Sequence, residues 1–229
     1  EVLARNQSAH GLVPGLIDDP GDLGATDTTP LFLLGLEVFR HVSGKRNYLE
    51  DASRKANTWM KYQSPFNNGI IAQLPTTDWR DEQWVFGYGL YVNSLVYLYY
   101  KISGRRKNAT EVKKFINERL SLAEKPHYAL YTYKVYTDRR FELLGNSLTI
   151  MAEISSEERG HKIVQWIENN CRELNIRGEL KGNLPPILIP YIRPEDDDWR
   201  TRYRIIINRG STIMGESGRL RRFLHCYID

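Results

Sequence analysis

Two aspartates flanking a tryptophan and an arginine form the part of the chain best suited to chemistry. The run Thr76-Thr77-Asp78-Trp79-Arg80-Asp81-Glu82 is followed by Gly87-Tyr88-Gly89 and then by an apolar segment from Leu90 to Tyr100. This order predicts an acidic loop that leads directly into a long helix, with the carboxylates of Asp78 and Asp81 at the helix N-terminus. Helix N-termini carry partial positive charge and unsatisfied N–H groups, which favour carboxylates there.

Carboxylates beside aromatic rings are what a sugar-cleaving site needs. An acid protonates the glycosidic oxygen, and a flat apolar ring such as that of Trp79 can pack against a pyranose face. The alternative interpretation is structural, because an aspartate in this position can also cap the helix. From these residues alone, both interpretations of Asp78 and Asp81 stay open.

Helical hairpins separated by long loops would position this stretch. Apolar periodicity with start and stop signals predicts helices over about residues 30–43, 47–62, 85–103, 110–122, 144–154 and 157–174. Residues 1–28 and 178–194 are expected to be irregular, and the aromatic segment 128–136 to be a short strand or an extended loop. The sequence therefore predicts an all-α fold of three successive hairpins, whose long loops build the site at one face.

The composition, with 41% hydrophobic and 26% charged residues, is ordinary for a globular chain. No apolar run is long enough for a transmembrane helix, and a start at glutamate rather than methionine suggests a fragment. Cys171 and Cys226 are the only cysteines, which argues against a disulfide framework and favours free thiols. His41, His127 and His161 lack partners at metal-ligand spacing and are expected to be ordinary surface or loop residues. We expect no metal and no cofactor.

The positive charge is concentrated at the C-terminal end. Residues 199–229 contain seven arginines and two acids, a net charge of +5, which leaves −1 for the first 198 residues. A basic tail can bind nucleic acid. This tail has no interleaved aromatic residues of the stacking kind and no recognisable binding module. We therefore expect no nucleic-acid partner.

Several stretches, in order along the chain, resemble the alkaline/neutral invertase family and its debranching-enzyme-like relatives. These are glycoside hydrolases built as an (α/α)6 barrel of six helical hairpins. The resembling stretches cover most of residues 10–200 and are Asp27 with Leu31-Phe32-Leu33-Leu34, Asp78-Trp79-Arg80-Asp81 with Gly87-Tyr88-Gly89-Leu90-Tyr91-Val92-Asn93, Asp138-Arg139-Arg140-Phe141-Glu142-Leu143-Leu144-Gly145-Asn146-Ser147, and Pro190-Tyr191 with Asp196-Asp197-Asp198-Trp199.

The resemblance implies an inverting hydrolysis by two carboxylates. The general acid of the family falls on Asp81, which requires a raised pKa. The neighbouring charge of Asp78 would raise that pKa, and Arg80 would oppose the effect. The resemblance also implies a sugar subsite, whose residues are Asp27, Asp78, Trp79, Tyr88 and Asn146. For each of these residues, packing or helix capping is the competing interpretation.

The C-terminal end departs from the family. The family continues with a Tyr-His-Asn-Gly-Gly-Ile-Trp-Pro-Phe block and with helices that bear the second catalytic carboxylate, a glutamate, and neither is found here. Residues 211–226 can be back-translated so that a shifted frame encodes this block. The hypothesis is that the reading frame is lost between about Ile205 and Ser211, which resequencing of codons 200–229 would test.

This hypothesis divides the chain into residues 1–204, an incomplete (α/α)6 glycoside hydrolase domain, and residues 205–229, an aberrant basic tail. Three of six hairpins cannot close a toroid, so apolar faces would stay exposed. Without the glutamate, the acid would lack a base that activates water. The polypeptide as written is therefore expected to fold poorly and to have little or no activity.

The leading functional prediction is an invertase-like β-fructofuranosidase, acting in the intact parent on sucrose or a similar small glycoside. One alternative is an amylo-α-1,6-glucosidase of the debranching type. Another is a non-catalytic carbohydrate-binding module or an inert gene fragment. The expected partner is a carbohydrate substrate rather than a membrane, and the expected location is the cytoplasm. The sequence leaves the sugar, its linkage and the oligomeric state open.

Overall fold

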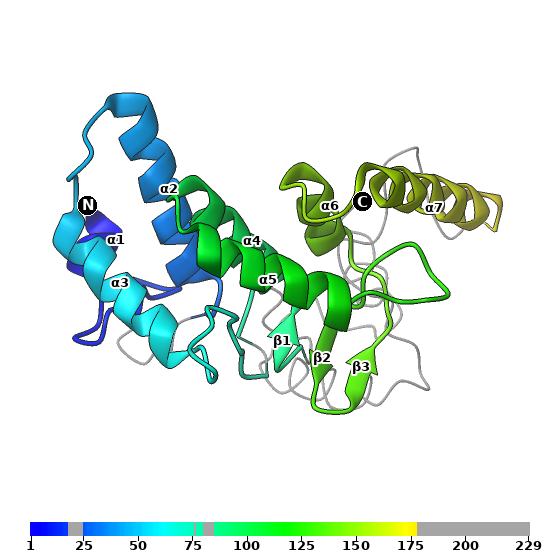
Figure 1. Ribbon diagram of the computed structural model, residues 1–229, viewed down its shortest axis with the longest axis horizontal. Coiled ribbons are helices and arrows are strands. Elements are labelled where there is room, and N and C mark those ends of the chain that lie inside the picture. The colour runs from blue at the N-terminus through cyan, green and yellow to red at the C-terminus, as the bar shows by residue number, and fades with distance from the viewer. Residues whose placement is uncertain (18–24, 76, 80–84, 178–229) are drawn as a thin grey trace, which may run out of the picture.

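The computed structural model describes residues 1–17, 25–75, 77–79 and 85–177, and this part of the chain is mostly helical (Figure 1). The mostly helical class is confirmed, although a small antiparallel sheet accompanies the helices. The elements in chain order are α1 (Val2–Arg5), α2 (Thr28–Ser43), α3 (Glu50–Tyr62), β1 (Tyr88–Gly89), α4 (Leu90–Ile102), α5 (Arg106–Arg119), β2 (Tyr131–Tyr133), β3 (Tyr136–Asp138), α6 (Leu143–Met151) and α7 (Glu157–Ile176).

Helices α2, α4 and α6 lie side by side, with α4 in the middle, and we call them the parallel layer. At one end, a Cβ atom on Gly145 of α6 would lie 3.0 Å from the backbone nitrogen of Tyr91 in α4. At the other end, Lys101 of α4 donates a hydrogen bond of 3.1 Å to the carbonyl of Ala152, just after α6. Asp27, which precedes α2, is hydrogen-bonded to Tyr91. All three helices therefore begin at the same end.

Each helix of the parallel layer is followed by a helix that packs against it. Helix α3 packs on α2, α5 on α4, and α7 on α6, and the three pairs follow one another across Figure 1. The first two pairs turn at Gly44 and Gly104, which have φ angles of 71° and 73°. These are the Ser-Gly stops expected from the sequence, because glycine adopts this left-handed conformation without strain. The described chain thus contains three helical hairpins in the predicted order.

Helix α4 forms the centre of the hydrophobic core. Ten of its residues are buried, as expected for a helix with neighbours on several sides. Its one buried asparagine, Asn93, is fully hydrogen-bonded: Oδ1 accepts the N–H of Ile71 at 2.9 Å, and Nδ2 donates to the carbonyls of Ile71 and Gly89 at 3.0 Å each. The segment before the acidic loop is therefore attached to the first turn of α4.

The three strands form an antiparallel sheet in the order β1-β2-β3. Strand β1 lies where the sequence predicted the start of a helix, so the prediction that the acidic loop leads directly into α4 is wrong. Gly87 has a φ of 71° and pairs with Gln73. The backbone of residues 87–89 is thus engaged by a β-bridge and by β2, and the helix begins only at Leu90.

Other differences from the sequence prediction are smaller. The short helix α1 lies within residues expected to be irregular. The aromatic segment 128–136 contributes β2 and the start of β3, a hairpin rather than a single strand. Ser156 caps α7 as predicted, accepting the N–H of Arg159 at 3.2 Å. Among the helices of the described ranges, none is long and apolar enough to cross a membrane. The predicted tail at 205–229 lies outside these ranges.

Candidate functional site

Asp27 immediately precedes α2, but its side chain does not cap this helix. The residue is only 3% exposed. Its Oδ2 accepts the backbone N–H of Trp79 at 3.1 Å, and the hydroxyl of Tyr91 hydrogen-bonds to the same carboxyl group. The capping interpretation of this side chain is therefore wrong. The carboxyl group of Asp27 instead connects α2 to the acidic loop and to α4.

The pKa of Asp27 is raised from 3.8 to about 6, mainly by burial and to a smaller extent by the charge of Asp78. The hydrogen bonds from Trp79 and Tyr91 favour the carboxylate and partly oppose this shift. Asp27 therefore gains and loses its proton near neutral pH. Titration in this range is characteristic of groups that act as acids, bases or polar ligands in functional sites.

Asp78 is 1% exposed, and its Oδ2 accepts a hydrogen bond of 3.1 Å from Nε2 of Gln73. Gln73 is itself held by two backbone hydrogen bonds to Gly87, of 2.7 and 2.8 Å. The N-cap of α4 is Gly89, which makes no side-chain cap. Asp78 is therefore not the cap of this helix, and the β-bridge holds its side chain in place.

Glu142 is a third buried carboxyl group, and it was not among the site residues predicted from the sequence. It is completely buried, and its Oε1 caps α6 by accepting the N–H of Gly145 at 2.9 Å. Together with burial, the charges of Asp27, Asp78 and Glu142 raise the pKa of Tyr91. Glutamate is not among the preferred N-cap residues, so no local sequence signal indicated this position.

We call these residues the carboxylate cluster: Asp27, Asp78, Trp79, Tyr91 and Glu142. Trp79 is half-buried, and its ring meets that of Tyr91 edge-on, with 6.5 Å between the centroids. Three of the five, Asp27, Asp78 and Trp79, were predicted site residues. The five come from the residue before α2, the acidic loop, α4 and the residue before α6. Within the described ranges, no group of three or more acidic, histidine or cysteine side chains is arranged to hold a metal ion.

The remaining predicted site residues lie elsewhere. Asp81, the predicted general acid, and Arg80 are outside the described residues. Tyr88 lies in β1 with its ring 5.3 Å from that of Phe115 in α5, and it lines a separate pocket. Asn146 is completely buried. Its Oδ1 accepts the N–H of Tyr128 at 2.9 Å, and its Nδ2 donates to the carbonyl of Glu142 at 2.9 Å, so its amide joins α6 to the preceding chain.

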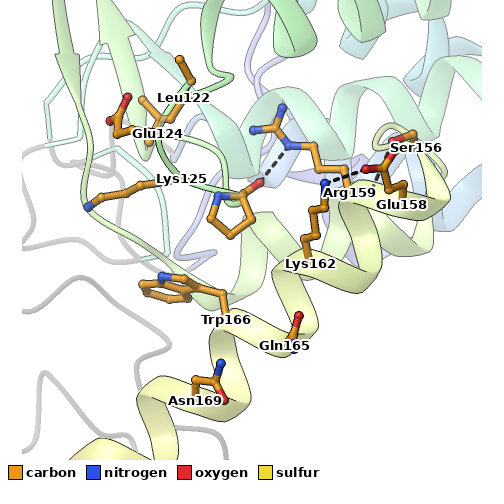
Figure 2. A pocket seen from close by; sticks show the side chains of 12 residues that line it. Leu122, Glu124, Lys125, Ser156, Glu158, Arg159, Lys162, Gln165, Trp166 and Asn169 are labelled. Carbon is orange, nitrogen blue, oxygen red and sulfur yellow. Dashed lines mark hydrogen bonds and ion pairs between the residues drawn. The ribbon is translucent and has the colours of Figure 1, made fainter.

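A pocket of about 620 Å³ lies between residues 122–126 and α7, and its lining includes none of the carboxylate cluster (Figure 2). Arg159 donates from Nε to the carbonyl of Pro126 at 2.8 Å, and Trp166 lies further along the same helix. Behind this pocket, the ring of His127 packs against those of Phe141 and Trp166, which also contact each other.

His127 lies in a loop, as predicted, but it is completely buried rather than on the surface. Burial lowers its pKa to about 4, so the imidazole is neutral at pH 7. The rings of Phe141 and Trp166 cover the imidazole. Because these residues are distant from His127 in the sequence, its burial could not be predicted from the sequence.

No protein-family model matches the chain, and no curated protein sequence matches it significantly. The resemblance to invertase-like glycoside hydrolases therefore stays a prediction from the sequence motifs.

Proposed function

We propose that this chain is part of an (α/α)6 glycoside hydrolase. Two features support the architecture: α2, α4 and α6 form a parallel layer, and each is followed by a helix that packs against it. In an (α/α)6 toroid, such a layer would be the inner ring, and three hairpins would supply half of it. The carboxylate cluster lies where the three inner helices begin, and the loops there would form the mouth of the ring.

The observation that carries the proposal is the buried Asp27, whose pKa is raised to about 6 beside Asp78. An inverting glycosidase needs one carboxyl group that keeps its proton near neutral pH and a second group that activates water. We assign protonation of the glycosidic oxygen to Asp81. Asp27 and Asp78 would accept hydrogen bonds from sugar hydroxyls, and Trp79 would pack against the sugar ring.

The proposed substrate is sucrose or a similar small glycoside, and a 1,6-linked glucan is the alternative. A thin-layer assay on both, using the protein with its reading frame restored after codon 205, separates them. Asp81→Asn should lower turnover at least about 100-fold, because a general acid contributes that much or more. Asp51→Asn is the matched control, since Asp51 is exposed on α3 and pairs with Arg54. Full turnover by Asp81→Asn would refute the proposal.

A second candidate is a non-catalytic carbohydrate-binding module in the cytoplasm. It is favoured by the small exposure of Asp27 and Asp78, at 3% and 1%, and by the hydrogen bonds that already engage both. In that case, calorimetric titration of the 229-residue chain with sucrose would show binding without hydrolysis, and Asp81→Asn would leave the affinity unchanged.

A further inference from the structure

A second pocket, of about 730 Å³, lies between α5, the β-sheet and the turn after α3. Four of its lining residues are aromatic, and we call this surface the aromatic groove: Phe66, Tyr88, Phe115 and Tyr133. Its volume falls within the range of small-molecule sites. None of the carboxylate cluster lines it, so the groove is a separate feature of the molecule.

Two rings of the groove are exposed, and the other two are half-buried and pack against the edge of the core. Phe66 is 74% exposed and Tyr133 is 41% exposed. Tyr88 and Phe115 are half-buried and form its floor, where they meet edge-to-face. Leaving a large ring in water costs free energy, and scattered single exposures are ordinary. Four rings gathered around one hollow are not scattered, and they indicate a surface that is covered when a ligand binds.

The two most exposed rings each precede a turn residue with a positive φ angle. Phe66 precedes Asn67 and Tyr133 precedes Lys134, and these two residues have φ angles of 52° and 53°. Asparagine adopts a positive φ readily, whereas lysine does so less often, and residues in uncommon conformations are found at ligand sites. Arg119 of α5 donates to the carbonyl of Lys134 at 3.4 Å, and the ammonium group of Lys134 lies 5.4 Å from the centre of the Tyr133 ring. The turn between β2 and β3 is thus hydrogen-bonded to α5 without a ligand.

The charges around the rings select the ligand. The rim carries two carboxylates, Glu111 and Glu118, and three cations, Lys114, Arg119 and Lys134. Mixed signs favour neither a polyanion nor a polycation, and they supply both donors and acceptors. A neutral molecule with flat apolar faces and many hydroxyl groups fits both the rings and the rim.

We propose that the aromatic groove binds a neutral oligosaccharide, with sugar faces on the rings and hydroxyl groups on the rim. This site goes beyond the proposed function, because no bond is cleaved there. Strand β1 lies between the two sites. Tyr88 lines the groove, whereas the next residue, Gly89, lies against Gln73, which binds Asp78. Successive residues of a strand face opposite sides, so the two sites would lie back to back.

The test is calorimetric titration of the full 229-residue chain with maltoheptaose and, separately, with nystose. For whichever of the two sugars binds, Phe66→Ala and Tyr133→Ala should each weaken the affinity about fivefold, which corresponds to the free energy of one aromatic contact. Tyr62→Ala is the matched control: Tyr62 is 68% exposed, does not line the groove, and its loss should leave the affinity unchanged. Helical circular dichroism checks that each variant folds.

Failure of either proposal can be recognised separately. Asp81→Asn should abolish hydrolysis and leave binding in the groove intact, and this result supports both proposals. Sugar binding by the chain without any hydrolysis by the frame-restored wild type supports the groove alone. Absence of binding for both sugars would overturn the groove proposal. It would also be overturned by equal binding of wild type, Phe66→Ala and Tyr133→Ala, or by an amphipathic peptide that binds the groove where neither sugar does.

Discussion

The carboxylate cluster and the aromatic groove depart from the usual burial pattern in opposite directions. In the cluster, three carboxyl groups are almost completely buried, although acidic residues are rarely buried to this extent. In the groove, two aromatic rings, Phe66 and Tyr133, face water above two rings that pack against the core. Both arrangements lower the stability of the fold. The two regions meet at β1, where Tyr88 lines the groove and Gly89 lies against Gln73, the partner of Asp78. The difference indicates that hydrogen bonds and charge determine the properties of the cluster, whereas exposed apolar surface determines those of the groove.

The largest expected effect concerns the charge in the cluster. Because the pKa of Asp27 is raised from 3.8 to about 6 in the folded protein, the folded state binds this proton more tightly than the unfolded state does. Its contribution to stability is greatest below the unfolded pKa and is lost as pH rises through 6. The free energy of unfolding should therefore fall by about 2.5 kcal/mol between pH 4 and pH 8 on account of this group.

Urea unfolding at several pH values measures this slope, and Asp27→Asn should remove it. Asp51→Asn, on the exposed face of α3, should leave the Asp27-dependent slope in place. An unchanged slope in Asp27→Asn would show that the cluster does not hold a proton in the folded state, and the contrast with the groove would lose its basis.

The next effect concerns the close approach of α6 to α4. A Cβ atom on Gly145 would overlap Oε1 of Glu142, which caps α6, and would lie 3.0 Å from the backbone nitrogen of Tyr91, which cannot move away easily. Gly145→Ala should therefore destabilise the protein by about 1–3 kcal/mol. Gly35→Ala is the matched control in α2, because nothing lies within 4 Å of its added methyl group. That change should stabilise the helix by about 0.5–1 kcal/mol, and midpoints of urea unfolding compare the two.

The smallest expected effects on stability come from removing one tyrosine hydroxyl group in each region. Tyr91→Phe removes a hydrogen bond to the buried Asp27 and should cost about 1 kcal/mol. Because this bond lowers the pKa of Asp27, its loss should also move the titration midpoint of Asp27 upward, which carboxyl-carbon NMR would detect. Tyr133→Phe, in the groove, should change stability by less than about 0.5 kcal/mol. Equal losses in the two variants would contradict the contrast drawn between cluster and groove.

Local signals predicted most of the helices, and non-local pairing explains where they failed. The Ser-Gly stops after α2 and α4 and the serine before α7 were readable because caps and turns depend on a few neighbouring residues. The late start of α4 was not, since residues 87–89 pair with Gln73 and with β2. Strand pairing of this kind depends on residues distant in the sequence, and propensity alone does not reveal it.

The candidate site was predictable only in part, for the same reason. Asp27 and Asp78 both carried cap-like local signals, and only the motif order indicated a different role for them. The structure turns both side chains away from capping, toward Trp79, Gln73 and Tyr91. Glu142 joins them because α6 begins beside α4, which is a tertiary relation without a signature near residue 142.

The central position of α4 has a consequence for how the molecule opens. This helix contacts α2 and α6 on its two sides and α5 behind it, whereas α7 contacts α6 alone among the helix pairs with extensive contact. Amide hydrogens of α4 should therefore exchange with deuterium last, those of α2 and α6 earlier, and those of α7 earliest among the long helices. Such a gradient would mean that the outer hairpins unfold locally before the central one, as terminal repeats do in repeat proteins.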